Sequence, residues 1–404
     1  MKSSVYPFRT TLAIAAFAFA LGSCKHSDPS PSSSNSSSSQ LDPTTSKSTL
    51  STINVSVASE IKDANNQPGN IAIRTLSNIS STTGGELAPT APINLRRSNP
   101  SNVNFGLLGF VEKLGKIGLN VTSQNNNLRI APDFNASKGI WQYNDTIGDF
   151  VKTGTASDIV IEFPDSINFV NKTGINNCVY TIQQLQTQIV SNTNTIVGGT
   201  LIDTLITQMT ANLYISGVKA MDLSFTATYG SDNQPNKVNY TLDIGDYTYT
   251  ISLLEALPTE TISESLEKSG TVVYSINYNA NFQGDTVISS TFQVGDIKVS
   301  GTLDYDKFYA YIISSYSTGT VSQTATDSVF AYPYYTGTVS QVSTGAKIGD
   351  IKELRTKVSV GTAPNTYSYY TTTSVVVYKD GTYDSLSTVL SSVWSFLSSL
   401  IGGV

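Results

Sequence analysis

Histidine is almost absent from this sequence, which contains only His26 among 404 residues. Ser-His-Asp triads, Cys-His dyads and His-ligated zinc sites each need a histidine within the folded part of a chain. His26 lies instead in a Ser-rich stretch near the N-terminus. The sequence also contains no phosphate-binding G-x-x-x-x-G-K-[ST] motif, so nucleotide binding has no support either.

Cysteine is scarce too, with Cys24 and Cys178 as the only two. Cys178 begins the strand-like segment 178–182, and we expect it to be a buried, unreactive core residue. Carboxylate catalysis of glycan hydrolysis remains open, but most Asp residues sit in Gly-containing turns. Ser265 and Lys268 fit an S-x-x-K pattern, in what we interpret as a polar loop. We therefore expect no enzyme and no cofactor.

Charged residues are also scarce. Charged residues make up 13% of the chain and the formal net charge is −6, whereas about a quarter of an average sequence is charged. No basic cluster is present, which argues against a nucleic-acid partner. Ser, Thr, Asn, Gln and Tyr supply the polarity instead, as suits strands that face water on one side.

Alternation of apolar and polar residues dominates the chain from about residue 50 onward. We predict a mainly β fold, a long antiparallel meander that forms a curled half-barrel, a barrel or a sandwich. Three Gly-Asp pairs, at 245–246, 295–296 and 349–350, resemble one hairpin corner used three times. In the less regular first half we expect short strands at 53–57, 71–76, 128–131, 140–143 and 159–163.

The C-terminal segment breaks this alternation. From Asp384, a suitable N-cap, apolar residues recur at helical spacing as far as Ile401, and Gly402 and Gly403 follow as a stop. The opposite face is almost entirely Ser and Thr. We predict an amphipathic helix within 384–404 that packs on the protein's own sheet, with Trp394 and Leu397 near the centre of the contact.

The N-terminus carries a positively charged start, an apolar stretch from Leu12 to Leu21, and then Gly22, Ser23 and Cys24. This ending resembles the bacterial lipobox, which implies that Cys24 is lipidated and begins the mature protein. We therefore divide the chain into a signal peptide (1–23), a Ser-rich flexible tether (24–48), an antiparallel β domain (49–383, with a division into two halves near 200) and the C-terminal helix (384–404).

The lipobox, the Ser- and Asn-rich tether and the Tyr/Thr-rich strands together resemble outer-membrane lipoproteins of the Bacteroidota. The resemblance extends to segments 157–164 and 377–381. It implies a bacterial outer-membrane location, with a lipid anchor in the membrane. In that group an acidic run after the Cys implies surface export, but here Lys25 follows Cys24, so the choice between the periplasmic face and the cell surface stays open.

Bacteria of this group often glycosylate Ser or Thr in Asp-Ser/Thr sequences that precede a small or apolar residue. The resemblance therefore implies six candidate O-glycosylation sites, which are Thr146, Ser166, Thr204, Thr286, Ser328 and Ser385. A turn or capping role for the preceding Asp explains several of these sequences equally well.

Tyrosines form two clusters late in the chain, which are Tyr332, Tyr334 and Tyr335, and then Tyr367, Tyr369 and Tyr370. Exposed Tyr rows can bind sugars or a partner, although Tyr is also a favoured strand residue. Our leading hypothesis is a non-catalytic, lipid-anchored envelope protein that binds an apolar ligand, such as a lipid, or an envelope protein. The alternatives are a surface adhesin or glycan-binding lipoprotein and, last, a carboxylate-dependent glycan hydrolase.

Overall fold

The computed structural model describes residues 40–80, 134–166, 174–196, 199–231, 235–256, 258–283, 286–307, 335–360 and 367–389. These residues belong to two compact units. The first unit contains the described residues up to Ser59, Glu255–Ser263 and the described residues from Val272 onward. The second unit contains those of Glu60–Leu254 and Glu264–Thr271.

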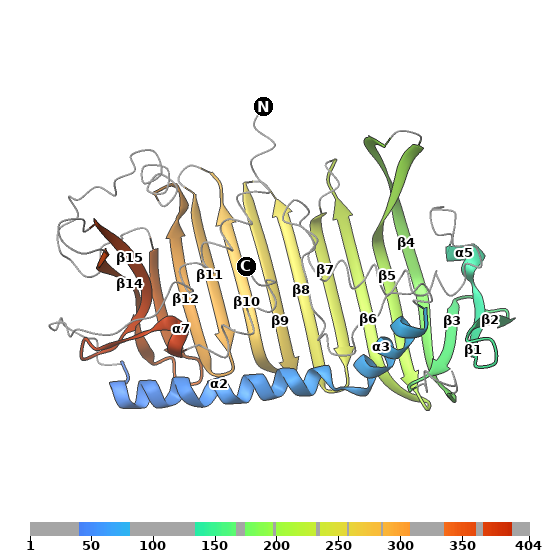
Figure 1. Ribbon diagram of the computed structural model, residues 1–404, viewed down its shortest axis with the longest axis horizontal. Helices are drawn as coiled ribbons and strands as arrows, with labels where there is room; N and C mark the ends of the chain where they lie inside the picture. Colours follow the sequence, from blue (N-terminus) through green and yellow to red (C-terminus); the bar gives the residue numbers. More distant parts are fainter. Residues whose placement is uncertain are drawn as a thin grey trace. The chain divides into compact units, whose positions relative to one another are not determined.

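The described chain is mainly β, and its strands form one open, 16-stranded sheet in the order β16-β15-β14-β13-β12-β11-β10-β9-β8-β7-β6-β5-β4-β3-β1-β2 (Figure 1). The strands are β1 (Gly139–Asn144), β2 (Asp149–Gly154), β3 (Ile159–Pro164), β4 (Asn176–Ile196), β5 (Gly199–Ile215), β6 (Val218–Tyr229), β7 (Pro235–Ile244), β8 (Tyr247–Ala256), β9 (Thr259–Lys268), β10 (Thr271–Asn281), β11 (Val287–Val294), β12 (Ile297–Asp304), β13 (Tyr335–Gln341), β14 (Lys347–Val360), β15 (Tyr367–Val377) and β16 (Tyr383–Ser385).

Chain order and spatial order coincide from β3 to β16, so the predicted meander is confirmed. β1 departs from it, because it pairs antiparallel with β2 and parallel with β3. The described strands form an open sheet and not a closed barrel, which leaves the curled sheet and the sandwich among the architectures we considered. The strands expected at 140–143 and 159–163 are confirmed as β1 and β3, whereas 128–131 lies outside the described residues.

Alternate residues of each strand supply the core. In the second unit, β6 buries Met221, Leu223, Phe225 and Ala227 while the residues between them are half-buried or exposed. In the first unit, β12 likewise buries Ile297, Val299 and Leu303. Burying one large apolar side chain is worth about 1.5–3 kcal/mol, so one face of the sheet accounts for much of the fold's stability.

Two helices replace the strands that we expected before residue 80. α2 (Pro43–Asn65) contains residues 53–57, and α3 (Pro68–Ser80) contains residues 71–76. Both strand predictions are wrong because a short run of β-branched and apolar residues has no unambiguous period. Residues 43–48 are helical as well, so they do not belong to a flexible tether.

Capping explains why α2 begins where it does. Asp42 accepts hydrogen bonds from the backbone N–H of Thr45 (3.0 Å) and from the Thr45 hydroxyl (2.6 Å), and Pro43 occupies the first helical position. An Asp N-cap before a Pro is a strong start signal for a helix. In α3 the buried residues Ala72, Ile73, Leu76 and Ile79 recur at helical spacing, which is the signal that could have corrected our prediction.

Two of the three expected Gly-Asp corners are hairpin turns. Gly245 and Gly295 have φ of 58° and 51° and lie between β7 and β8 and between β11 and β12. The third prediction is wrong, because Gly349 lies within β14. A Cβ at Gly349 would come within 2.7 Å of the Val377 carbonyl oxygen, so this glycine permits close approach of β15.

The C-terminal helix is described only in its first turn. α7 (Leu386–Val389) lies against β15 and β16, and Leu386 is buried. Asp384 is not the N-cap that we predicted, because α7 begins at Leu386 and Asp384 lies two residues earlier. Asp384 belongs to β16 and forms an ion pair with Lys47 of α2 (3.1 Å). Trp394 and Leu397 lie outside the described residues. α5 (Phe134–Ser137) is a further single helical turn.

None of the helices within the described ranges has the length and apolar character needed to span a membrane.

Candidate functional site

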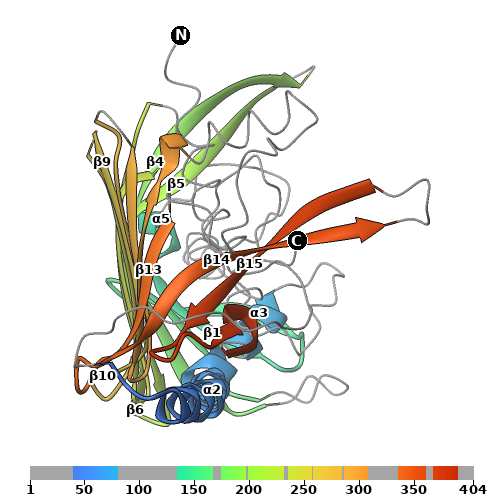
Figure 2. The same cartoon turned by 90° about the vertical axis from the view of Figure 1, so that its left-hand side faces the viewer.

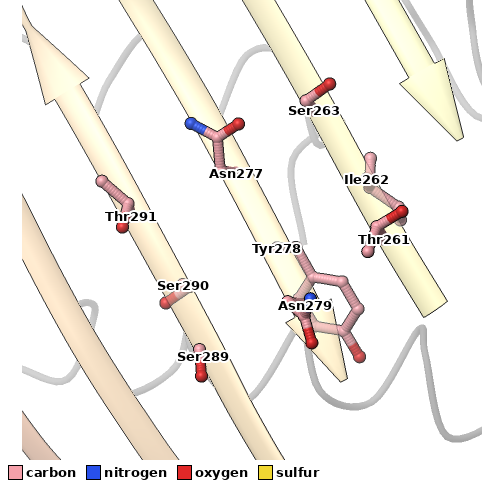
Figure 3. A pocket seen from close by; sticks show the side chains of 9 residues that line it. All are labelled: Thr261, Ile262, Ser263, Asn277, Tyr278, Asn279, Ser289, Ser290 and Thr291. Carbon is pink, nitrogen blue, oxygen red and sulfur yellow. The ribbon is translucent and has the colours of Figure 1, made fainter. Parts of the chain in front are cut away.

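A shallow pocket of about 260 Å³ lies over three neighbouring strands of the first unit, β9, β10 and β11 (Figure 3). Each strand contributes three consecutive residues, which are Thr261, Ile262 and Ser263, then Asn277, Tyr278 and Asn279, then Ser289, Ser290 and Thr291. None of these nine residues carries a formal charge. The pocket is therefore a neutral surface rich in hydroxyl and amide groups.

Strand alternation explains this composition. On β10 the side chains of Asn277 and Asn279 are exposed, while Tyr278 between them is buried at 7% exposure. Asn277 pairs with Thr291 across the ladder and Asn279 pairs with Ser289. Since residues directly opposite each other lie on the same face of a sheet, these four polar residues share one face.

The same polar face continues beyond the pocket into β12 and β13. Two cross-strand rows follow from the strand registers, each with one residue on each of β10, β11, β12 and β13. We call them the hydroxyl grid, and their members are Asn277, Thr291, Ser300 and Thr338 in one row and Asn279, Ser289, Thr302 and Thr336 in the other.

The grid is regular because strands in a sheet are about 4.8 Å apart and same-face residues along a strand are about 6.6 Å apart. Asn277, Asn279, Ser289, Thr302, Thr336 and Thr338 are exposed. The Thr302 and Thr336 hydroxyls lie 2.6 Å apart and hydrogen-bond to each other, so neighbouring members of a row can order one another. Every hydroxyl and amide of the grid can both donate and accept hydrogen bonds.

Tyr278 is the one residue with an ionisable side chain among the nine that line the pocket. Burial is the main cause that raises its pKa above the ordinary tyrosine value, and the nearby side chains of Glu260 and then Tyr305 raise it further. Tyr278 therefore stays neutral at physiological pH, and the pocket's other side chains do not titrate there. The arrangement can hydrogen-bond a neutral polar ligand, but its lining has no group suited to general acid–base catalysis at neutral pH.

A charged cluster in the second unit is the other chemically distinct feature. Lys268, at the end of β9, donates to Glu60 (2.8 Å) and Asp63 (3.1 Å) of α2. The Tyr247 hydroxyl, 2.5 Å from Glu60 and 2.8 Å from Asp63, donates to the same two carboxylates. The Lys268 ammonium also lies 5.2 Å from the centre of the Tyr247 ring, a cation–π contact.

These contacts shift the pKa values of Glu60, Asp63 and Lys268 so that the charged form of each side chain is favoured. The hydrogen bond from Lys268, and then that from Tyr247, lowers the pKa of Glu60, and the hydrogen bonds from Tyr247 and Lys268 lower the pKa of Asp63. The hydrogen bond to Glu60 is the largest cause of the raised pKa of Lys268. The charged Lys268 side chain, paired with the two ionised carboxylates, holds the C-terminal end of α2 against the sheet.

This pairing corrects our interpretation of the S-x-x-K pattern. Ser265 and Lys268 lie in β9 and not in a polar loop. The Ser265 hydroxyl is 2.7 Å from the Thr250 hydroxyl, whereas the Lys268 ammonium binds α2. The structure therefore assigns the two residues to different contacts. We mistook the strand for a loop because its sequence, 259–268, contains three glutamates and a lysine, which are unusual in a strand.

The candidate glycosylation sites that lie in described residues differ in how exposed they are. Thr146 and Ser166 are exposed, and Ser385 is half-buried with its hydroxyl 2.7 Å from that of Ser387. Thr286 is buried at 3% exposure, so its hydroxyl does not suit glycan attachment. Thr204 lies in β5, in a part whose side chains are not described, and Ser328 lies outside the described residues.

Four tyrosines of the two clusters lie in described strands. Tyr335 begins β13, and Tyr367, Tyr369 and Tyr370 lie at the start of β15. Tyr332 and Tyr334 lie outside the described residues, as does Cys24. The four tyrosines in described strands are not among the residues that line the pocket. We did not predict the hydroxyl grid, although alternating Ser, Thr and Asn residues in consecutive hairpins gave a signal that could have identified it.

The predicted core cysteine is confirmed, because Cys178 in β4 is fully buried and its thiol is free. Burial, and then the charge of Asp165, raises the pKa of this thiol to about 12. Within the described ranges, no group of three or more His, Cys, Asp or Glu side chains is placed to hold a metal ion.

Comparison with known proteins gave no match to a family model, to a curated protein or to a solved structure.

Proposed function

We propose that this chain is a non-catalytic, lipid-anchored protein of the bacterial cell envelope, and that it binds a neutral glycan through the hydroxyl grid. The observation that carries the proposal is the grid itself, a regular, largely exposed array of hydroxyl and amide groups without formal charge. The lipid anchor and the location rest on the lipobox-like sequence that ends at Cys24.

Hydrogen-bond chemistry supports a glycan as the ligand. A neutral sugar presents hydroxyl groups that donate and accept, as Ser, Thr and Asn side chains do. Each such bond contributes only about 0.5–1.5 kcal/mol, so a single contact binds weakly. Several grid positions can contact a polymeric glycan at once, and this multivalency raises the overall affinity.

Burial on the opposite face favours a polar ligand over the apolar ligand that we first considered. In β10–β12 the residues that alternate with the grid include Tyr278, Ala280, Ile288 and Phe292, and they are between 0% and 7% exposed. They already form the core of their unit. The hydroxyl grid is exposed on the same strands, so it is the surface left for a partner.

A glycan array tests the proposal. The mature chain with Cys24→Ser, which has no lipid and stays soluble, is applied to immobilised neutral oligosaccharides and to acidic ones that contain uronic or sialic acids. We expect retention on a subset of the neutral glycans. Retention on acidic glycans alone, or on none, would contradict the proposal.

The anchor is tested separately in cells. We expect wild-type protein in the membrane fraction and the Cys24→Ser protein in the soluble fraction after a high-salt wash, because the lipid supplies the firm attachment. A Cys24→Ser protein that stays in the washed membrane fraction would show that the lipobox interpretation is wrong.

A further inference from the structure

The hydroxyl grid is longer across the strands than along them. Its two rows cross β10, β11, β12 and β13, and the pocket adds Thr261 and Ser263 of β9 beside them. Neighbouring strands are about 4.8 Å apart, so these strands give a neutral band of roughly 19 Å in this direction. Along each strand the band has only two grid positions, such as Asn277 and Asn279 of β10 (Figure 3). Two such positions are about 6.6 Å apart.

Charged residues lie beyond the grid in both directions along the strands. On one side the next row contains the exposed Lys298 of β12, opposite Gln293 of β11. On the other side it contains Asp304, which forms an ion pair with Lys307 and lies opposite the exposed Val287. A neutral ligand that covers a charged side chain removes its water and supplies no opposite charge, which costs free energy. A neutral chain that ran along the strands would therefore meet an unfavourable surface on either side of the grid.

Across the strands, the band ends at β13. Thr338, the last residue of one row, lies opposite Asp350 of β14, and Asp350 forms an ion pair with Lys347 (2.7 Å). Figure 2 shows β14 and β15 turning away from the layer that contains β10 and β13. The neutral surface therefore extends from the pocket on β9–β11 to β13.

These dimensions favour one shape of glycan. One strand spacing is close to the length of a pyranose ring in an extended chain, so a chain that lies across the strands places about one sugar over each strand. The two grid positions of a strand can then hydrogen-bond to opposite edges of that sugar. A branch at either edge would extend along the strand, toward Lys298 or toward Val287 and Asp304.

We propose that the ligand of the hydroxyl grid is a linear, unbranched neutral polysaccharide whose chain lies across strands β9–β13. The grid binds about five consecutive sugars, one for each strand. This inference rests on the glycan binding proposed above, and it adds the direction, the length and the unbranched form of the bound chain.

The dependence of affinity on chain length tests the inference. The soluble Cys24→Ser chain is titrated with linear β-1,4-linked oligomers of glucose, mannose and xylose, from the dimer to the octamer. Fragments of xyloglucan and galactomannan with the same backbone lengths serve as the branched counterparts. We expect the affinity for at least one linear series to rise roughly two- to tenfold with each added sugar up to about five, and then to level off. The branched fragments should bind roughly tenfold more weakly than the linear oligomer of equal backbone length.

Two variants test the direction of the chain. Thr336→Val with Thr338→Val removes two exposed hydroxyls from the last strand of the grid and keeps the β-branched shape. It should weaken binding of the hexamer roughly threefold or more, and leave binding of the trimer, which the pocket on β9–β11 can hold, unchanged. The matched control is Lys298→Gln, which changes an exposed residue beside the grid in the direction of the strands and should alter neither affinity. Both variants should melt close to the parent.

The outcomes separate this inference from the proposed function. Neutral glycans that bind with no dependence on chain length, or branched fragments that bind as tightly as linear ones, would overturn the inference and leave glycan binding in place. Retention on the neutral glycan array without binding to any linear series would do the same. An equal loss for trimer and hexamer in the Thr336 and Thr338 variant, or a loss of the same size in the Lys298 control, would overturn the direction of the chain. No binding to any neutral glycan would overturn both proposals.

Discussion

The two faces of strands β10–β12 contain alternate residues of the same sequence but have opposite properties. One face contains Ile288, Phe292 and Val299, each no more than 6% exposed. The other contains the hydroxyl grid, which is largely exposed and uncharged. Both faces have the same backbone, register and turns, so the difference between them comes from the side chains alone. The comparison suggests that stability depends on one face, which leaves the other free to bind.

The largest expected effect comes from the buried face. Phe292→Ala removes a core side chain and should lower the free energy of unfolding by about 3–5 kcal/mol. The adjacent Thr291→Ala, on the grid face, should change it by less than about 1 kcal/mol. Urea unfolding of both variants measures the difference. If both variants lost the same free energy of unfolding, stability would not depend mainly on the buried face.

At Tyr278 we expect a smaller effect on stability, and in the stabilising direction. Its hydroxyl is buried and has no hydrogen-bond partner among the described residues. An unsatisfied buried polar group costs about 1–3 kcal/mol, so Tyr278→Phe should leave the melting temperature unchanged or raise it. Tyr247→Phe is the matched control, because that hydroxyl donates to Glu60 and Asp63. We expect the control to lower the melting temperature, and a Tyr278→Phe protein that melts lower than its parent would contradict the interpretation.

The smallest expected effect concerns the charged cluster and depends on pH. Glu60 and Asp63 have lowered pKa values in the folded chain, so their contribution is present at neutral pH and is lost as the pH falls through those values. Lys268→Met should therefore lower the melting temperature at pH 7, and the difference from wild type should shrink toward pH 3. Lys219→Met, which removes the cation of the exposed Lys219–Asp222 pair, is the control. A difference that grows toward low pH would exclude this linkage.

The sequence predicted most of the fold because alternation is unambiguous in long strands. The alternation of β6, β10 and β12 also indicated which residues are buried. The wrong predictions were confined to short segments. Residues 53–57 and 71–76 are helical, since short β-branched runs suit either structure and the capping by Asp42 was overlooked. Gly349 resembled a turn residue but permits close approach of two strands.

The candidate site was harder to predict than the fold. Composition alone indicated a polar, uncharged surface, but the hydroxyl grid depends on which residues of four strands lie opposite one another. That register is set by turn lengths and by the packing of the buried face. The tyrosine clusters pointed to a different place, because Tyr367 and Tyr369 lie in β15 and are not among the residues that line the pocket.

The most direct test of the account compares glycan binding by three proteins on the same array of neutral oligosaccharides. These are the parent Cys24→Ser chain, the same chain with Asn277→Ala and Asn279→Ala, and the same chain with Asn239→Ala. Asn239 is an exposed asparagine of β7 outside the grid. We predict roughly tenfold or greater loss of affinity for the double variant, with unchanged melting temperature, and parental affinity for Asn239→Ala. Equal affinity of all three proteins would contradict the assignment of the hydroxyl grid as the binding surface.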